Sequence, residues 1–224
     1  MQEHTRNKRT QSGFSLVELM IAMAVTLVVT VLASNLIAGS MRTRSRENQR
    51  SEALADAQRA LYVMSREIAN SGFGLSSNGL VAADSTSSSI RVRANLNAFD
   101  GQLTSDSVTD SDEDVKYLLY TNASDSYVVR LDVNTGARTT ILANRVDALS
   151  IGYFADKVTY TVDNCVITPS TAEVTQKSAA RYIVVALCVQ LPAQGKPGTT
   201  GYQPASSVQL VSDVSLRNAD LYNY

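Results

Sequence analysis

The stretch Gly13-Phe14-Ser15-Leu16-Val17-Glu18 opens an apolar run that continues to Ala38. Glu18 is the one ionisable residue in the 25 positions from Phe14 to Ala38. A helix of that length reaches roughly 37 Å, which exceeds the ~30 Å thickness of the hydrocarbon core of a bilayer. Its Leu, Ile, Met and Ala residues favour a helix, and no proline precedes Pro169. The run therefore predicts a helix long and apolar enough to cross a membrane.

Glu18 is costly in such a segment and calls for an explanation. A carboxylate in a membrane helix costs about 2.5–3.5 kcal/mol on insertion scales. One interpretation is a charge tolerated near the membrane interface. The other rests on its setting, because Glu18 is the fifth residue of a run that follows a basic leader and Gly13.

This setting resembles the type IV prepilin signal, in which a membrane peptidase cleaves after the glycine and methylates the new amino terminus. The resemblance implies cleavage between Gly13 and Phe14. It also implies that Glu18 docks one subunit on another. An ordinary secretory signal fits less well, because its apolar core has about 7–15 residues before a small-x-small site. Ile37-Ala38-Gly39 is a poor version of that site.

The chain divides into four predicted parts. Residues 1–13 form the leader, 14–38 the membrane or filament-core helix, 39–73 its amphipathic continuation, and 74–224 an exported β-rich domain. Apolar residues at spacings of three and four mark one face of the continuation. They are Leu54, Ala57, Leu61, Met64 and Ile68. The glycines of Ser71-Gly72-Phe73-Gly74 are expected to end the helix.

Alternating and continuous apolar segments predict strands in the remainder. The expected strands are residues 90–96, 115–121, 127–133, 137–142, 146–154, 182–191 and 208–216. The segment 182–191 is almost continuously apolar, which indicates a central strand buried on both faces. The predicted fold class is α+β, a long helical stem packed on an antiparallel β-sheet domain.

Three further segments resemble PilW-type minor pilins. They are the helix exit at residues 61–73, the strand Val146-Asp147-Ala148-Leu149-Ser150-Ile151-Gly152-Tyr153, and the closing Val214-Ser215-Leu216-Arg217-Asn218. Pseudopilins of type II secretion, of the J kind, share weaker versions of all three. Export, implied by the resemblance, would place Cys165 and Cys188 in an oxidising compartment, where a disulfide is expected. Two separate buried thiols are the alternative.

The lack of histidine in the predicted mature chain argues against an enzyme. The one histidine, His4, lies in the leader, so no histidine-based triad or histidine-ligated metal is available to the mature chain. No cofactor or metal is predicted. The polar, acidic segment 99–114 lacks the glycine and spaced glutamate of a calcium loop, and we interpret it as a solvated loop, with calcium binding as the alternative. The basic cluster 42–50 is interpreted as a solvated helix face beside the membrane, with DNA or lipid phosphate binding as the alternative.

The resemblance implies a minor pilin that initiates or primes assembly of a type IV pilus and supports adhesion, twitching motility or DNA uptake. Its implied partners are other minor and major pilins, the prepilin peptidase and the inner-membrane assembly platform. The implied location is the bacterial inner membrane, with the domain in the periplasm, and the filament. The net charge of −1 does not call for nucleic acid as an obligate partner. The alternatives are a type II secretion pseudopilin and a membrane-anchored binding module that does not polymerise.

Overall fold

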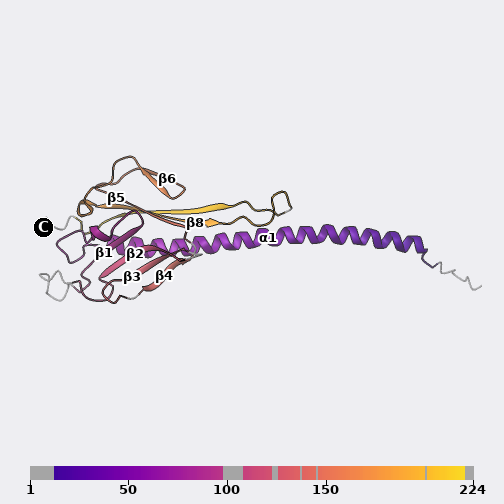
Figure 1. Ribbon diagram of the computed structural model, residues 1–224, viewed down its shortest axis with the longest axis horizontal. Coiled ribbons are helices and arrows are strands. Elements are labelled where there is room, and N and C mark those ends of the chain that lie inside the picture. Colours follow the sequence, from indigo (N-terminus) through magenta and orange to yellow (C-terminus); the bar gives the residue numbers. More distant parts are fainter. Residues whose placement is uncertain are drawn as a thin grey trace, which may run out of the picture.

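The computed structural model describes residues 13–97, 108–122, 126–136, 138–144, 146–199 and 201–219. One helix, α1 (Leu16–Ala69), extends over 54 residues and carries a β-rich domain on its second half. Figure 1 shows its first half projecting well beyond that domain. The fold class is α+β, a long amino-terminal helix packed on antiparallel sheets, as predicted.

The second half of α1 buries the apolar face that the sequence predicts. Ala57, Leu61, Met64 and Ile68 are buried, and Leu54 is partly buried against the same core. The helix ends at Ala69, and the next two turns of chain use glycine where the backbone is left-handed. At Gly72, with φ +80°, an added Cβ would lie 2.6 Å from the carbonyl oxygen of Ser77. The chain therefore reverses tightly behind the helix.

Four antiparallel strands form the first sheet, in the order β1-β2-β3-β4. They are β1 (Ser89–Arg93), β2 (Asp114–Thr121), β3 (Ser126–Asp132) and β4 (Arg138–Asn144). Gly136, with φ +65°, lies in the turn between β3 and β4. Each of these strands falls within a few residues of a predicted strand, because the alternation of apolar and polar residues matches a sheet with one covered face.

The second sheet has the order β5-β8-β9, again antiparallel. It contains β5 (Ala148–Phe154), β8 (Tyr182–Leu191) and β9 (Ser206–Ser215). β8 is the central strand, and nine of its ten residues are buried. Ile183, Val185 and Leu187 belong to the main core that α1 covers, whereas Tyr182 and Val184 belong to a smaller core on the opposite face.

A hairpin of β6 (Tyr160–Asp163) and β7 (Val166–Pro169) contributes to that smaller core. Neither strand is among those predicted, and the predicted single sheet is wrong, because the structure has two sheets and a hairpin. Partly buried Tyr160 and Ile167 pack on the smaller core. The hairpin thus explains why β8 is apolar on both faces.

The two sheets enclose the helix. α1 packs against β4 on one side and against β9 and β8 on the other, while β1 and β5 approach each other. Figure 1 shows the two sheets on either side of the carboxyl-terminal half of α1. The short 3-10 helices η1 (Ala82–Asp84) and η2 (Lys177–Ala179) lie in the connections. The domain core therefore forms around the second half of the stem.

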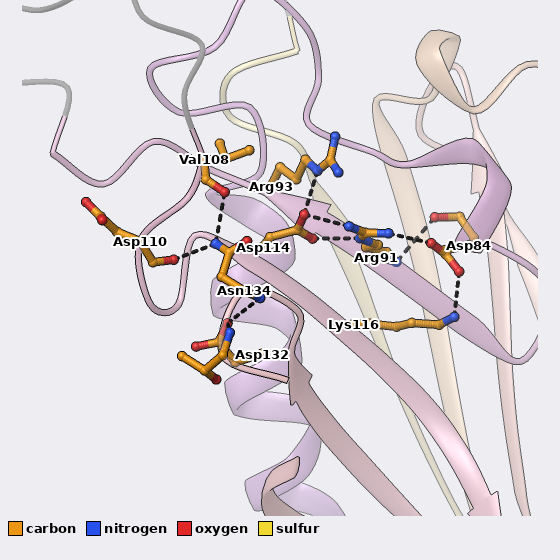
Figure 2. A network of polar contacts seen from close by, with 11 residues as sticks. Asp84, Arg91, Arg93, Val108, Asp110, Asp114, Lys116, Asp132 and Asn134 are labelled. Atoms are coloured by element: carbon orange, nitrogen blue, oxygen red, sulfur yellow. Dashed lines mark hydrogen bonds and ion pairs between the residues drawn. The ribbon is translucent and has the colours of Figure 1, made fainter. Parts of the chain in front are cut away.

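The acidic segment corrects one prediction. Residues 98–107 lie outside the described part of the chain, but Glu113 and Asp114 are each only 2% exposed. Figure 2 shows Asp114 facing Arg91 and Arg93. Arg91 donates two hydrogen bonds of 2.7 Å to this carboxylate, and Arg93 donates one of 2.8 Å. The end of the predicted solvated loop is therefore the buried start of β2, because paired cations offset the cost of burying the carboxylate.

Candidate functional site: the amino-terminal stem

The predicted processing residues lie together at the exposed start of the stem. Gly13 and Phe14 precede α1, and Phe14 is 85% exposed. Ser15 occupies the N-cap position in an extended conformation, and its carbonyl accepts the amide of Leu19 at 3.1 Å. An added Cβ at Gly13 would meet no atom within 4 Å. Gly13 and Phe14 thus lie at the exposed start of the described chain.

Glu18 lies in the first turn of α1 and is exposed. The partial positive charge at a helix amino terminus favours a carboxylate there. Among the described residues of this chain, no cation forms a salt bridge with Glu18.

The rest of the exposed stem presents an apolar surface. In the described part of the chain, α1 is the one helix that is long and apolar enough to cross a membrane, and its most apolar stretch, of mean hydropathy 2.5, is not buried. Its hydroxyl groups are satisfied internally. Thr26, Thr30 and Ser34 donate to the carbonyls of Ala22, Thr26 and Thr30 at 2.9, 2.8 and 2.8 Å. Because these donors are satisfied, the stem suits a medium without water.

Where the apolar run ends, a loop of the domain fastens to the stem. This β8–β9 loop comprises residues 192–205, of which residue 200 lies outside the described part. Arg46 of α1 is 5% exposed and donates to the carbonyls of Leu191 at 3.1 Å, Pro204 at 2.8 Å and Pro192. It also donates to the Ser206 hydroxyl at 2.8 Å. One buried guanidinium therefore joins both ends of the loop to the helix.

The tip of the same loop touches the stem through its backbone. An added Cβ at Gly201, with φ +77°, would lie 2.6 Å from the Cα of Gly39. Gly39 is the first buried residue of α1. Farther along the helix, Gln49 accepts a hydrogen bond of 2.9 Å from the side chain of Gln194. The loop thus follows one face of α1 from Gly39 to Gln49.

A second polar contact joins α1 to the first sheet. Glu67 accepts the hydroxyl proton of Tyr117 in a short contact and the Nε–H of Arg130 at 3.0 Å. Arg130 also pairs with Asp112 at 2.7 Å. Burial, followed by the neighbouring Glu67 charge, raises the pKa of the Tyr117 hydroxyl. The phenol therefore stays protonated and keeps its hydrogen bond to the helix.

Cys165 and Cys188 form a disulfide far from the processing residues, with their Cα atoms 5.8 Å apart. Cys188 lies on the face of β8 that the β6–β7 hairpin covers. Asn164 and Cys165 both have positive φ, of 48° and 64°, and form the two-residue turn of that hairpin. Gln209 of β9 accepts the amide proton of Cys165 at 3.3 Å. The bond and this amide contact hold the hairpin on the sheet.

Sequence reasoning missed Arg46 and the contact between Gly39 and Gly201. It assigned Arg46 to a solvated basic face, because a run of arginines beside a membrane helix is usually exposed. The spacing of Gly39, Arg46 and Gln49 was the available signal, since these positions share one helical face. What they contact belongs to a distant loop. In the described part of the chain, no group of three or more His, Cys, Asp or Glu residues is placed to hold a metal.

Comparison with known proteins identifies a motif at the start of the stem. Residues 8–34 match the family described as the prokaryotic N-terminal methylation motif. Among solved structures, the chain is similar to a type IV-like pilin from Thermus thermophilus, at 12% sequence identity and a TM-score of 0.43, over 74% of this chain and 96% of that chain. No curated protein matches the chain. The matched motif contains Gly13, Phe14 and Glu18, so the exposed stem begins with a prepilin-type methylation motif.

Proposed function

We propose that the chain is a structural subunit of a type IV pilin-family filament and, more narrowly, a minor pilin that primes pilus assembly. The observation that carries this proposal is the exposed apolar half of α1, most of which lies within the methylation motif. A soluble protein rarely leaves so large an apolar surface uncovered. Lipid covers it in the membrane, and the stems of neighbouring subunits cover it in a filament.

Each predicted part of the chain has a role in this proposal. Residues 1–13 are removed, and residues 14–38 anchor the chain before they enter the filament core. Residues 39–73 carry the exported domain, residues 74–224. The implied partners are major and minor pilins, the prepilin peptidase and the inner-membrane assembly platform. PilW-like motifs favour a pilus over a type II secretion filament.

The first experiment is mass spectrometry of the mature amino terminus. The proposal expects loss of residues 1–13 and a methylated Phe14. A Gly13→Val variant, with a branched side chain at the cleavage point, should keep its leader. A mature chain that starts at Met1 or near Gly39 would overturn the proposal.

The second experiment concerns Glu18. In a packed bundle the methylated amine of a neighbouring Phe14 can lie beside this carboxylate, which sets one axial offset between subunits. We expect Glu18→Ala to leave cleavage and folding unchanged but to reduce the share of protein in sheared filaments relative to membranes. Glu47→Ala, which removes an exposed carboxylate from α1 outside the apolar run, is the matched control. Equal incorporation of the Glu18 variant would refute the docking role.

A further inference from the structure

The β8–β9 loop forms the end of the domain nearest to the apolar stem. Figure 1 shows this loop as the part of the domain that reaches furthest along α1 toward its amino terminus. Its Gly201 touches Gly39, the residue directly after the apolar run. The Gly39 contact and the buried Arg46 therefore fix the position of the loop along the axis of α1.

The loop and the adjacent turns of α1 carry cations and no acidic residues. Lys196 in the loop and Arg44 on the helix are exposed, and Arg42 lies against Gly195. The sequence from Gly39 to Arg46 and the loop 192–205 contain no Asp or Glu, and the first carboxylate beyond the apolar run is Glu47. In the described part of the chain, Lys196 and Arg44 form no salt bridge.

The height of these cations matches the headgroup layer of a bilayer. That layer adds about 5–8 Å to each side of the hydrocarbon core. Arg44 follows Gly39 by five residues, which is roughly 7.5 Å along a helix. When Ala38 lies at the boundary of the hydrocarbon, Arg44 and the tip of the loop thus lie among the phosphates.

We propose that this end of the domain binds an anionic phospholipid surface, with Lys196 and Arg44 as the contacting groups. The inference rests on the membrane-anchored state in the proposed function. The loop then contacts the bilayer surface and fixes the orientation of the domain before the subunit enters a filament. Nucleic acid is the less favoured source of phosphate, because the apolar stem beside these cations places lipid there.

The test uses the full chain, reconstituted in vesicles, with a fluorophore on a single added thiol. Both native cysteines are in the disulfide, so a Thr199→Cys variant labels the exposed tip of the loop alone. The vesicles contain a small fraction of lipid that carries a quencher near its headgroup. The quencher is placed on phosphatidylglycerol in one sample and on phosphatidylcholine in the other.

We expect quenching by phosphatidylglycerol to exceed quenching by phosphatidylcholine by about two- to fivefold, since each surface cation favours anionic lipid about fivefold. Neutralising both cations, with Lys196→Gln and Arg44→Gln, should bring the ratio close to one. High salt should do the same. A label at Ser76, which follows the far end of α1, should show no quenching by either lipid.

Two results would overturn the inference. Equal quenching by both lipids would show that the tip reaches the membrane without selecting anionic lipid. Absence of quenching, or binding of a DNA duplex that depends on Lys196, would show that the bilayer is not the partner. Resistance of the protein to alkaline extraction from the vesicles tests the anchor separately. If the chain resists extraction but its loop is quenched equally by both lipids, the proposed binding of anionic lipid is wrong and the proposed function still stands.

Discussion

Replacing Arg46 by Met removes the guanidinium that joins the β8–β9 loop to the stem and keeps most of the side-chain length. Hydrogen bonds from a charged donor contribute about 1.5–3 kcal/mol each. Arg46 makes them to four acceptors. The net loss is smaller than four such bonds, because Met avoids the several kcal/mol needed to bury the charge. Pro192 and Pro204 are exposed, so water can reach their freed carbonyls, whereas Leu191 is buried. We expect about 2 kcal/mol less stability.

We expect Arg46→Met to increase local opening of the β8–β9 loop more than global unfolding of the domain. Gln194 and Gln203 exchange two backbone hydrogen bonds of 2.9 Å across the loop. At 1.4 kcal/mol per tenfold, a loss of about 2 kcal/mol speeds the exchange of these amides roughly 30-fold. Hydrogen exchange of the full chain in detergent micelles measures this directly, and denaturant unfolding gives the global change.

Arg50→Met is the matched control. Arg50 follows Arg46 by about one turn of α1 but is exposed, so its loss should change stability by less than about 0.5 kcal/mol. The reasoning fails if Arg46→Met and Arg50→Met have equal stability and equal exchange at Gln194. It also fails if Arg46→Met is more stable than the parent, because the charge would then be a net cost.

Two further predictions concern the domain. Replacing Cys165 and Cys188 by Ser should lower stability by about 3 kcal/mol in the chain-entropy model, given their separation of 23 residues, and denaturant unfolding with and without reductant checks this. Burial opposes ionisation of Asp114, but hydrogen bonds from Arg91 and Arg93 outweigh it and lower the pKa of this carboxyl. Its stabilisation is therefore present above the unfolded pKa of about 3.9 and is lost as pH falls through the folded pKa. Asp114→Asn should reduce the dependence of the free energy of unfolding on pH between about pH 5 and 2, which denaturant unfolding at each pH measures.

The stem and the central strand could be predicted from the sequence because one local pattern determines each. An uninterrupted apolar run has few structural solutions, and a stripe at spacings of three and four needs a cover. β8 was recognised for a related reason, since ten nearly all-apolar residues before Pro192 suit a strand covered on both faces. Both elements can be predicted without knowing which segments of the chain pack on them.

The β6–β7 hairpin and the role of Arg46 depend on distant contacts, and the sequence reading missed both. The turn Asp163-Asn164-Cys165-Val166 carries a local signal, because Asn tolerates the positive φ of a tight hairpin turn. Its strands have only four residues each and bury little by themselves. Arg46 has no such signal, because carbonyls contributed by residues 191–204 convert an ordinary arginine into a buried one.

The structure also suggests which residue sets the axial register of the stem in the proposed filament. Moving residues 14–38 from lipid to a bundle of similar helices exchanges one apolar surrounding for another, so the hydrophobic effect contributes little to that step. Thr26 and Ser34 offer no free donor either, since both bond within the helix. In the proposed docking, Glu18 is the group whose free energy differs most between the two surroundings, because lipid lacks a counterion and the amine of a neighbouring Phe14 would provide one. If Glu18 has the proposed docking role, this single carboxylate would set the register of the apolar helix.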